Sequence, residues 1–119
     1  MPEPDVRLNE SYSVGVGDVF LSVTIGEGQN GTSSVYLDEN RLVSACNHIG
    51  LLLVGNGTAV QGKTLLVRSV VNDVSAMTNR MSVTYMLKGG VTDQTFTARG
   101  QVKNEGDLLI FEAKWSLNT

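Results

Sequence analysis

The chain has 119 residues, of which 41% are apolar and 18% are Asp, Glu, Lys or Arg. This length and apolar content fit one folded domain with its own core, and they exclude a disordered chain. No apolar run approaches the length that a membrane-spanning helix needs. The net charge of −3 and the even spacing of Lys and Arg exclude the basic patch that nucleic-acid binding requires.

Residues 1–10 carry two prolines and several charges, which predicts a flexible tail. We therefore expect a single domain over residues 11–119. The start of the chain lacks the basic and apolar regions of a signal peptide. The compartment stays open, because the first Met could also replace the leader of an exported protein.

The first half of the domain is dominated by a period of two. Residues 18–26 alternate apolar and polar side chains, which predicts a half-buried strand. After a glycine-rich break the extended character resumes over 33–37, and residues 38–41 read as a turn. The inward face of the first strand is formed by Val19, Leu21, Val23 and Ile25.

The middle of the chain is harder to interpret. Residues 42–55 are mixed, and within them the apolar run 51–54 predicts a central strand that is buried on both faces. Residues 55–57, with two glycines, predict a turn. The segment 63–74 is rich in β-branched residues and favours a strand, although a helical stripe can also be drawn over 65–77.

Three strands are expected at the end of the chain, over 81–87, 94–102 and 108–117. Short turns join them, so they predict an antiparallel meander, with a bulge at Gly100. One face of the last strand carries only apolar side chains, which places Trp115 in the core with Phe111 and Leu109. That face consists of Leu109, Phe111, Ala113, Trp115 and Leu117.

The whole pattern predicts an all-β fold of about eight strands. We expect a single-domain antiparallel β-sandwich, and a small closed β-barrel is the alternative. In general look the chain resembles an immunoglobulin-like module. It departs from that domain's Cys–Trp–Cys spacing, because Cys46 is its sole cysteine.

Residues 57–64, "GTAVQGKT", match the phosphate-binding pattern G-x-x-x-x-G-K-[ST]. Such a loop holds phosphate only when a strand precedes it and a helix follows. The β-branched residues after Thr64 disfavour that helix. We therefore interpret the match as a glycine-rich connection with an exposed Lys63, and we predict no nucleotide binding.

Cys46 and His48 would face the same way on a strand, so a thiolate–imidazole pair is conceivable. His48 is the only histidine, and zinc would need two further ligands. A buried cysteine and a locally bonded histidine are the simpler interpretation.

Two polar clusters raise the question of calcium: residues 38–40, and Asn72 with Asp73. The spacing of a calcium-binding loop is absent, so the first cluster reads as a solvated turn. Overall we predict no catalytic, cofactor-binding or metal-binding residues.

The chain has one His, one Cys and few charged residues, with no cluster of carboxylates. This composition favours a non-catalytic module that acts through contact with another protein or with itself. The loops 26–34 and 88–93 and any open edge strand are the expected contact regions. A small-molecule-binding barrel is the alternative, and an enzyme or nucleotide binder ranks third.

Overall fold

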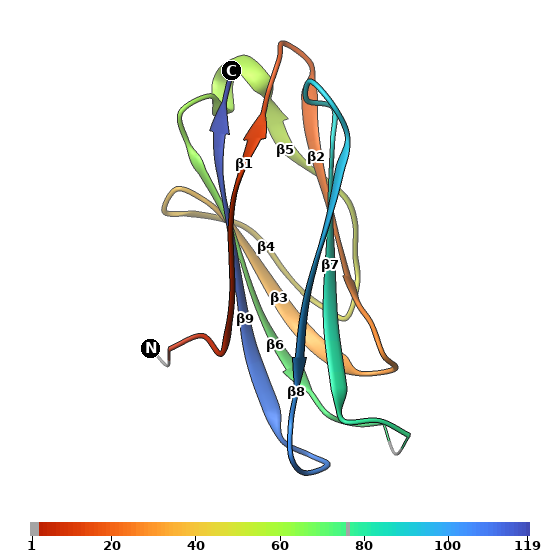
Figure 1. The fold of residues 1–119 in the computed structure, drawn as a ribbon. Coiled ribbons are helices and arrows are strands. Elements are labelled where there is room, and N and C mark those ends of the chain that lie inside the picture. The colour runs from red at the N-terminus through yellow and green to blue at the C-terminus, as the bar shows by residue number, and fades with distance from the viewer. Residues whose placement is uncertain (1–2, 76) are drawn as a thin grey trace.

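The fold is that of a computed structural model, which describes residues 3–75 and 77–119. Nine strands and one helical turn follow one another along the described chain (Figure 1). They are β1 (Val6–Ser13), β2 (Asp18–Ile25), β3 (Asn30–Leu37), β4 (Asn40–Cys46), β5 (Ile49–Asn56), α1 (Gly57–Val60), β6 (Thr64–Asn72), β7 (Arg80–Lys88), β8 (Gln94–Gln101) and β9 (Leu108–Asn118).

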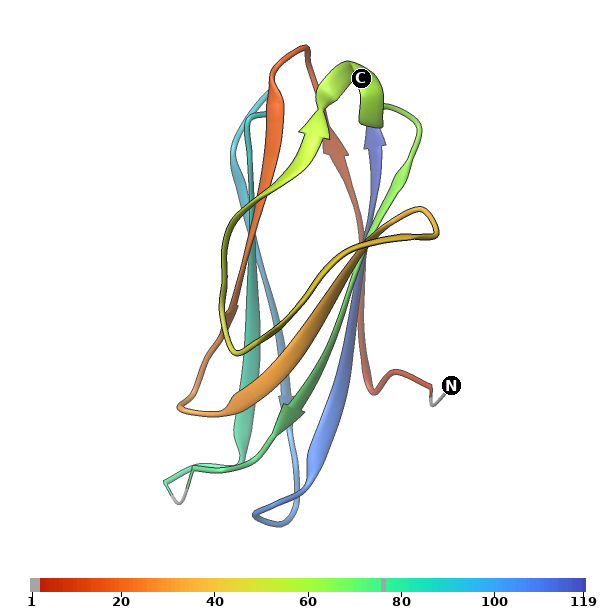
Figure 2. The ribbon, with the colours of Figure 1, turned by 180° about the vertical axis from the view of Figure 1, so that it is seen from behind.

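The strands form two sheets, which confirms the predicted sandwich. Sheet A has the order β1-β9-β6-β3-β4, and sheet B has the order β5-β2-β7-β8. Seen from behind, the chain passes from β4 to β5 along one side of the sandwich and so changes sheet (Figure 2). The barrel alternative is wrong, because each sheet keeps two edge strands and does not close on itself.

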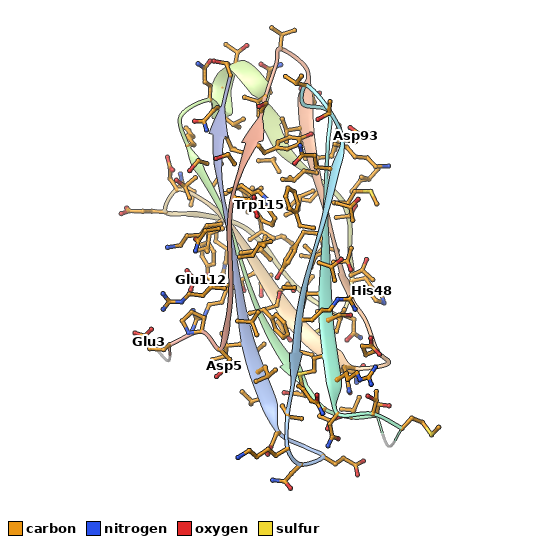
Figure 3. The ribbon with its side chains drawn as sticks, viewed as in Figure 1. Glu3, Asp5, His48, Asp93, Glu112 and Trp115 are labelled. Carbon is orange, nitrogen blue, oxygen red and sulfur yellow. The ribbon has the colours of Figure 1, made fainter. Side chains whose placement is uncertain are left out.

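The core lies between the sheets and is built from the inward positions of alternating strands. Trp115 and Phe111 are fully buried there, as predicted, and Leu109 is partly buried against the same core. Trp115 lies between the two sheets (Figure 3). Tyr85 and Phe96 contact its ring edge-on, with ring centroids at 5.2 and 5.5 Å. Such edge-to-face packing adds to the stabilisation that burial of the rings already provides.

The expected tail requires a correction, because residues 6–10 belong to strand β1. This strand runs parallel to β9, whereas the other strand pairs are antiparallel. Val6 and Leu8 are partly buried against the core, and the Asp5 N–H donates to the Ile110 carbonyl at 2.8 Å. The charged residues of this segment obscured the apolar alternation of Val6 and Leu8 in the sequence.

The expected terminal meander is also wrong. β7 and β8 pair antiparallel in sheet B, but β9 crosses to sheet A and inserts between β1 and β6. Gly100 is no bulge, because it stands opposite Met81 in an unbroken register. A Cβ atom at Gly100 would come within 2.6 Å of the Leu109 side chain, so a larger residue there would force that side chain to shift.

The largest correction concerns the run 51–54. It lies in β5, which is an edge strand of sheet B and not a central strand. Leu51 is 63% exposed and Leu53 is 52% exposed, whereas Val54 is buried. Leu52 is partly buried against the core. A continuous apolar run in the sequence does not show whether a second layer covers the outer face of the strand. Among the described residues, no such layer covers the outer face of β5.

Segment 65–77, for which a helix was the alternative, is a strand up to Asn72, and residue 76 lies outside the described residues. Gln29, in the turn between β2 and β3, fastens the connection between β6 and β7 through four hydrogen bonds. Its Oε1 accepts from the N–H groups of Val74 and Ser75 at 2.8 and 3.0 Å. Its Nε2 donates to the carbonyls of Thr78 and Arg80 at 3.1 and 2.9 Å.

A few polar groups lie inside the core. The Ser33 and Ser69 hydroxyls pair at 2.7 Å between neighbouring strands of sheet A. Burial raises the pKa of the Tyr85 phenol strongly, and the neighbouring Ser69 hydroxyl opposes part of that rise. Tyr85 therefore stays a neutral member of the core throughout the ordinary pH range.

We predict that the fluorescence of Trp115, the only tryptophan, is blue-shifted in the native protein and moves to the red on unfolding. Replacing Trp115 by Ala should lower the free energy of unfolding by about 3–5 kcal/mol, as large truncations in a core do. Emission typical of water-exposed indole in the folded protein would show that the register of β9 is wrong.

We predict that Gln29→Ala lowers the free energy of unfolding by about 2–4 kcal/mol, because four backbone groups lose their partner. Urea denaturation measures this change. Gln94→Ala is the control, since Gln94 is exposed at the start of β8 and should change stability by less than about 0.5 kcal/mol. Equal effects of the two substitutions would contradict the role of Gln29.

Candidate functional site

Residues 57–64, which match the phosphate-loop pattern, fold as a connection between two strands, as the sequence predicts. Gly57–Val60 makes a single helical turn, capped by the Asn56 side chain, which accepts from the Thr58 N–H at 3.0 Å. Strand β6 then begins at Thr64. No helix N-terminus follows Lys63, so the strand–loop–helix geometry that cradles phosphate is missing from this described segment.

Cys46 and His48 are not brought together as a pair on one strand. β4 ends at Cys46, and Asn47 between the two residues adopts a positive φ of 61°. The period-two assumption therefore fails at this point. Both side chains are exposed, so the expectation of a buried cysteine is wrong. His48 lies on the opposite side of the molecule from Glu112 (Figure 3).

The two acidic clusters do not form a calcium site either. The Asp38 carboxylate accepts from the Thr64 N–H at 2.9 Å and so ties the β3–β4 turn to β6. Asn72 is exposed while Asp73 is buried, so their side chains point to opposite faces. Among the described residues, no group of three or more His, Cys, Asp or Glu side chains could hold a metal ion.

The two loops expected to be contact regions are shorter and better fastened than the sequence indicates. Residues 30–34 of the first belong to β3, which leaves a tight turn over 26–29. In the second, the Gly90 N–H donates to the Tyr12 hydroxyl at 3.0 Å and the Val91 N–H donates to the Ser13 carbonyl at 3.0 Å. The second loop is therefore fastened to β1, and the first is confined to a short turn.

The feature that the sequence did not locate is an apolar strip on the outer face of sheet B. Register places Leu53 beside Phe20, and the β-bulge that follows brings Leu51 near Ser22 and hence toward Met86. Leu51 and Leu53 are exposed, and Phe20 and Met86 are partly buried. We call these four residues the apolar strip.

Strand β5, which supplies both leucines, is also an open edge. It pairs with β2 alone, and that register shifts twice along the strand. Irregularities of this kind disturb the straight row of N–H and C=O groups that an added strand would need. The strip is therefore suited to contact through side chains and not to strand addition.

The outer face of sheet A has a different character. Glu112 lies within 3.4 Å of both the Arg68 guanidinium and the Lys114 ammonium group. Beside this network a cavity of about 290 Å³ is lined by Tyr36, Asp38, Leu66, Arg68 and Glu112. Partly exposed ion pairs of this kind remain in contact with water. The outer face of sheet A is therefore more polar at this point than the apolar strip of sheet B.

No known protein family, characterised protein or solved structure shows a significant similarity to the chain. Within residues 3–75 and 77–119, no helix has the length and apolar character that a membrane crossing requires. Any function has to be argued from the surfaces of the sandwich themselves.

We predict that calorimetric titration with ATP and magnesium gives no binding heat, because no helix follows the loop. Lys63→Ala should change the free energy of unfolding by no more than about 0.5 kcal/mol. Micromolar binding that disappears in the Lys63→Ala variant would contradict this interpretation of residues 57–64.

Proposed function

We propose that the chain is a non-catalytic β-sandwich module that binds another protein, a second copy of itself included, through the apolar strip of sheet B. The observation that carries the proposal is the exposure of Leu51 and Leu53 side by side on an ordered sheet. Neighbouring apolar side chains that stay in water on one face are a common mark of a protein contact site.

Burial of the two exposed leucines alone would support only a weak contact. Complete burial of a leucine side chain stabilises by about 1.5–3 kcal/mol. Leu51 and Leu53 are 63% and 52% exposed, so covering both yields on the order of 3 kcal/mol. That is less than even a millimolar complex requires, so polar groups around the strip must add to it.

Such groups are present on the same face. Lys88 stands opposite Phe20 in the register, and Thr24 stands opposite Thr84 further along the sheet. An apolar centre with a polar rim is the usual anatomy of a protein interface. Lys88 also favours a partner that brings an acidic group to this end of the strip.

The arrangement of titratable groups supports a non-catalytic role. The Cys46 and His48 side chains lie on either side of a left-handed residue, and Asp38 is engaged by a backbone N–H group. The chain has a general likeness to immunoglobulin-like modules. This likeness is an analogy between folds and remains a prediction.

The test compares Leu53→Lys with Ser116→Lys. Both positions are exposed, but Ser116 lies on β9 in sheet A, on the other side of the sandwich from the strip. Self-association is measured by sedimentation velocity over a range of concentrations, and capture of partners is measured by cross-linking in the native extract. Leu53→Lys should weaken whichever contact occurs by at least about tenfold, because the ammonium group must be desolvated.

Ser116→Lys should leave the same contact unchanged. If the native protein stays monomeric and its capture pattern is identical to that of Leu53→Lys, the strip is not a contact site. Equal losses in both variants would assign the effect to added charge and would likewise contradict the proposal.

A further inference from the structure

A second feature of sheet B lies at the other end of the same sheet from Phe20 and Lys88. A cavity of about 370 Å³ is lined by Glu27, Arg80, Met81, Arg99, Gly100 and Gln101. Its lining comes from the start of β7, the end of β8 and the turn between β2 and β3. This volume lies within the range of sites that bind small molecules.

The register of β7 and β8 brings the two arginines together. Arg80 stands opposite Gln101, and Ser82 stands opposite Arg99, so the arginines are diagonal neighbours. They share the outer face, because the intervening Met81 and the next residue inward, Val83, are buried in the core. Like charges so placed repel one another unless an anion lies between them.

Neither guanidinium group is neutralised within the described part of the chain. The ion pairs found there involve Arg7, Arg68 and Lys114. The hydrogen bonds at Arg80 use its backbone: its N–H donates to the Thr78 hydroxyl, and its carbonyl accepts from Gln29. The guanidinium donors of Arg80 and Arg99 are thus left to face solvent at the cavity.

Glu27 is held at the cavity by a tight turn. Glu27 and Gly28 both have positive φ angles, of 61° and 72°, and the Gln29 N–H donates to the Gly26 carbonyl at 3.2 Å. The Gly26 N–H in turn donates to the Ser82 carbonyl at 2.9 Å, which fixes the turn to β7. The carboxylate therefore lines the cavity without lying within ion-pair distance of either arginine.

We propose that this cavity, here called the arginine pocket, binds a small organic anion through Arg80 and Arg99. Each guanidinium presents a planar fork of donors that matches the two oxygens of a carboxylate or a phosphate group. Glu27 and Gln101 supply acceptors for a hydroxyl or amino group on the same ligand. The ligand class is thus a carboxylate or phosphate ester that also carries such a donor.

The fit to an organic molecule, and not to a bare ion, follows from two observations. The cavity is larger than an inorganic phosphate or chloride ion requires. A bare anion would also be repelled by Glu27 without gaining anything from it. The net charge of the chain is −3, so its overall field does not attract anions and binding must depend on this local pair.

The experiment follows the arginine Nε–Hε signals by nuclear magnetic resonance at low ionic strength. The probes are phosphoserine, citrate and inorganic phosphate. We expect saturable shifts of the Arg80 and Arg99 signals with phosphoserine or citrate. Inorganic phosphate should bind at least about tenfold more weakly.

Four variants complete the test. Arg80→Gln and Arg99→Gln should each weaken binding by about tenfold or more, because a charge-assisted pair of hydrogen bonds is lost. Arg41→Gln removes the same charge from exposed β4 and should leave binding unchanged. Glu27→Gln should lower the affinity for phosphoserine, whose amino group it would bind, while raising the affinity for citrate or inorganic phosphate.

The outcomes that overturn the proposal are equally specific. No saturable shift with either organic probe excludes the pocket as an anion site. An equal loss in Arg41→Gln would show that any binding reflects general charge. Inorganic phosphate that binds as tightly as phosphoserine would contradict the organic ligand.

Discussion

The pairing of β6 with β9 is the constraint on which the rest of the sandwich depends. It sets Trp115 opposite Leu65 and Phe111 opposite Ser69, and it turns the large side chains of β9 into the space between the sheets. β1 is then added on the free side of β9, in parallel. Because β9 is the last strand, the core closes only when the C-terminal segment joins strands far away in the sequence, as expected of a slowly folding β topology.

The sandwich has two outer faces, and these faces carry different kinds of side chain. On sheet A, Glu112 forms ion pairs with Arg68 and Lys114. On sheet B, the apolar strip occupies one end and the arginine pocket the other, with threonines of β7 and β8 between them. The proposed protein contact and the proposed anion site thus use one face without overlapping, and a partner bound at the strip would leave Arg80 and Arg99 accessible.

The fold class was predictable because alternation of apolar and polar residues is a local signal, and it held from Val19 to Ile25 and from Phe111 to Leu117. Three predictions failed where the answer depended on partners distant in the sequence. The charges around Val6 obscured strand β1, which pairs with β9 alone among the described strands. The turn before β9 gives no sign in the sequence that β9 joins the other sheet. The apolar run 51–54 gives no sign that β5 is an edge strand. The strip and the arginine pocket were missed for the same reason, since only the register across β5, β2, β7 and β8 assembles them.

The outer face of sheet B is open to solvent at the apolar strip, where Leu51 and Leu53 are exposed. The paramagnetic relaxation of leucine methyl protons by an inert soluble spin probe, in dilute protein, measures this exposure. We expect strong relaxation for Leu51 and Leu53 and almost none for Leu21 and Leu87, which are fully buried. Methyl groups of Leu51 and Leu53 that are as protected as those of Leu21 would contradict it, because β5 would then be covered on both faces.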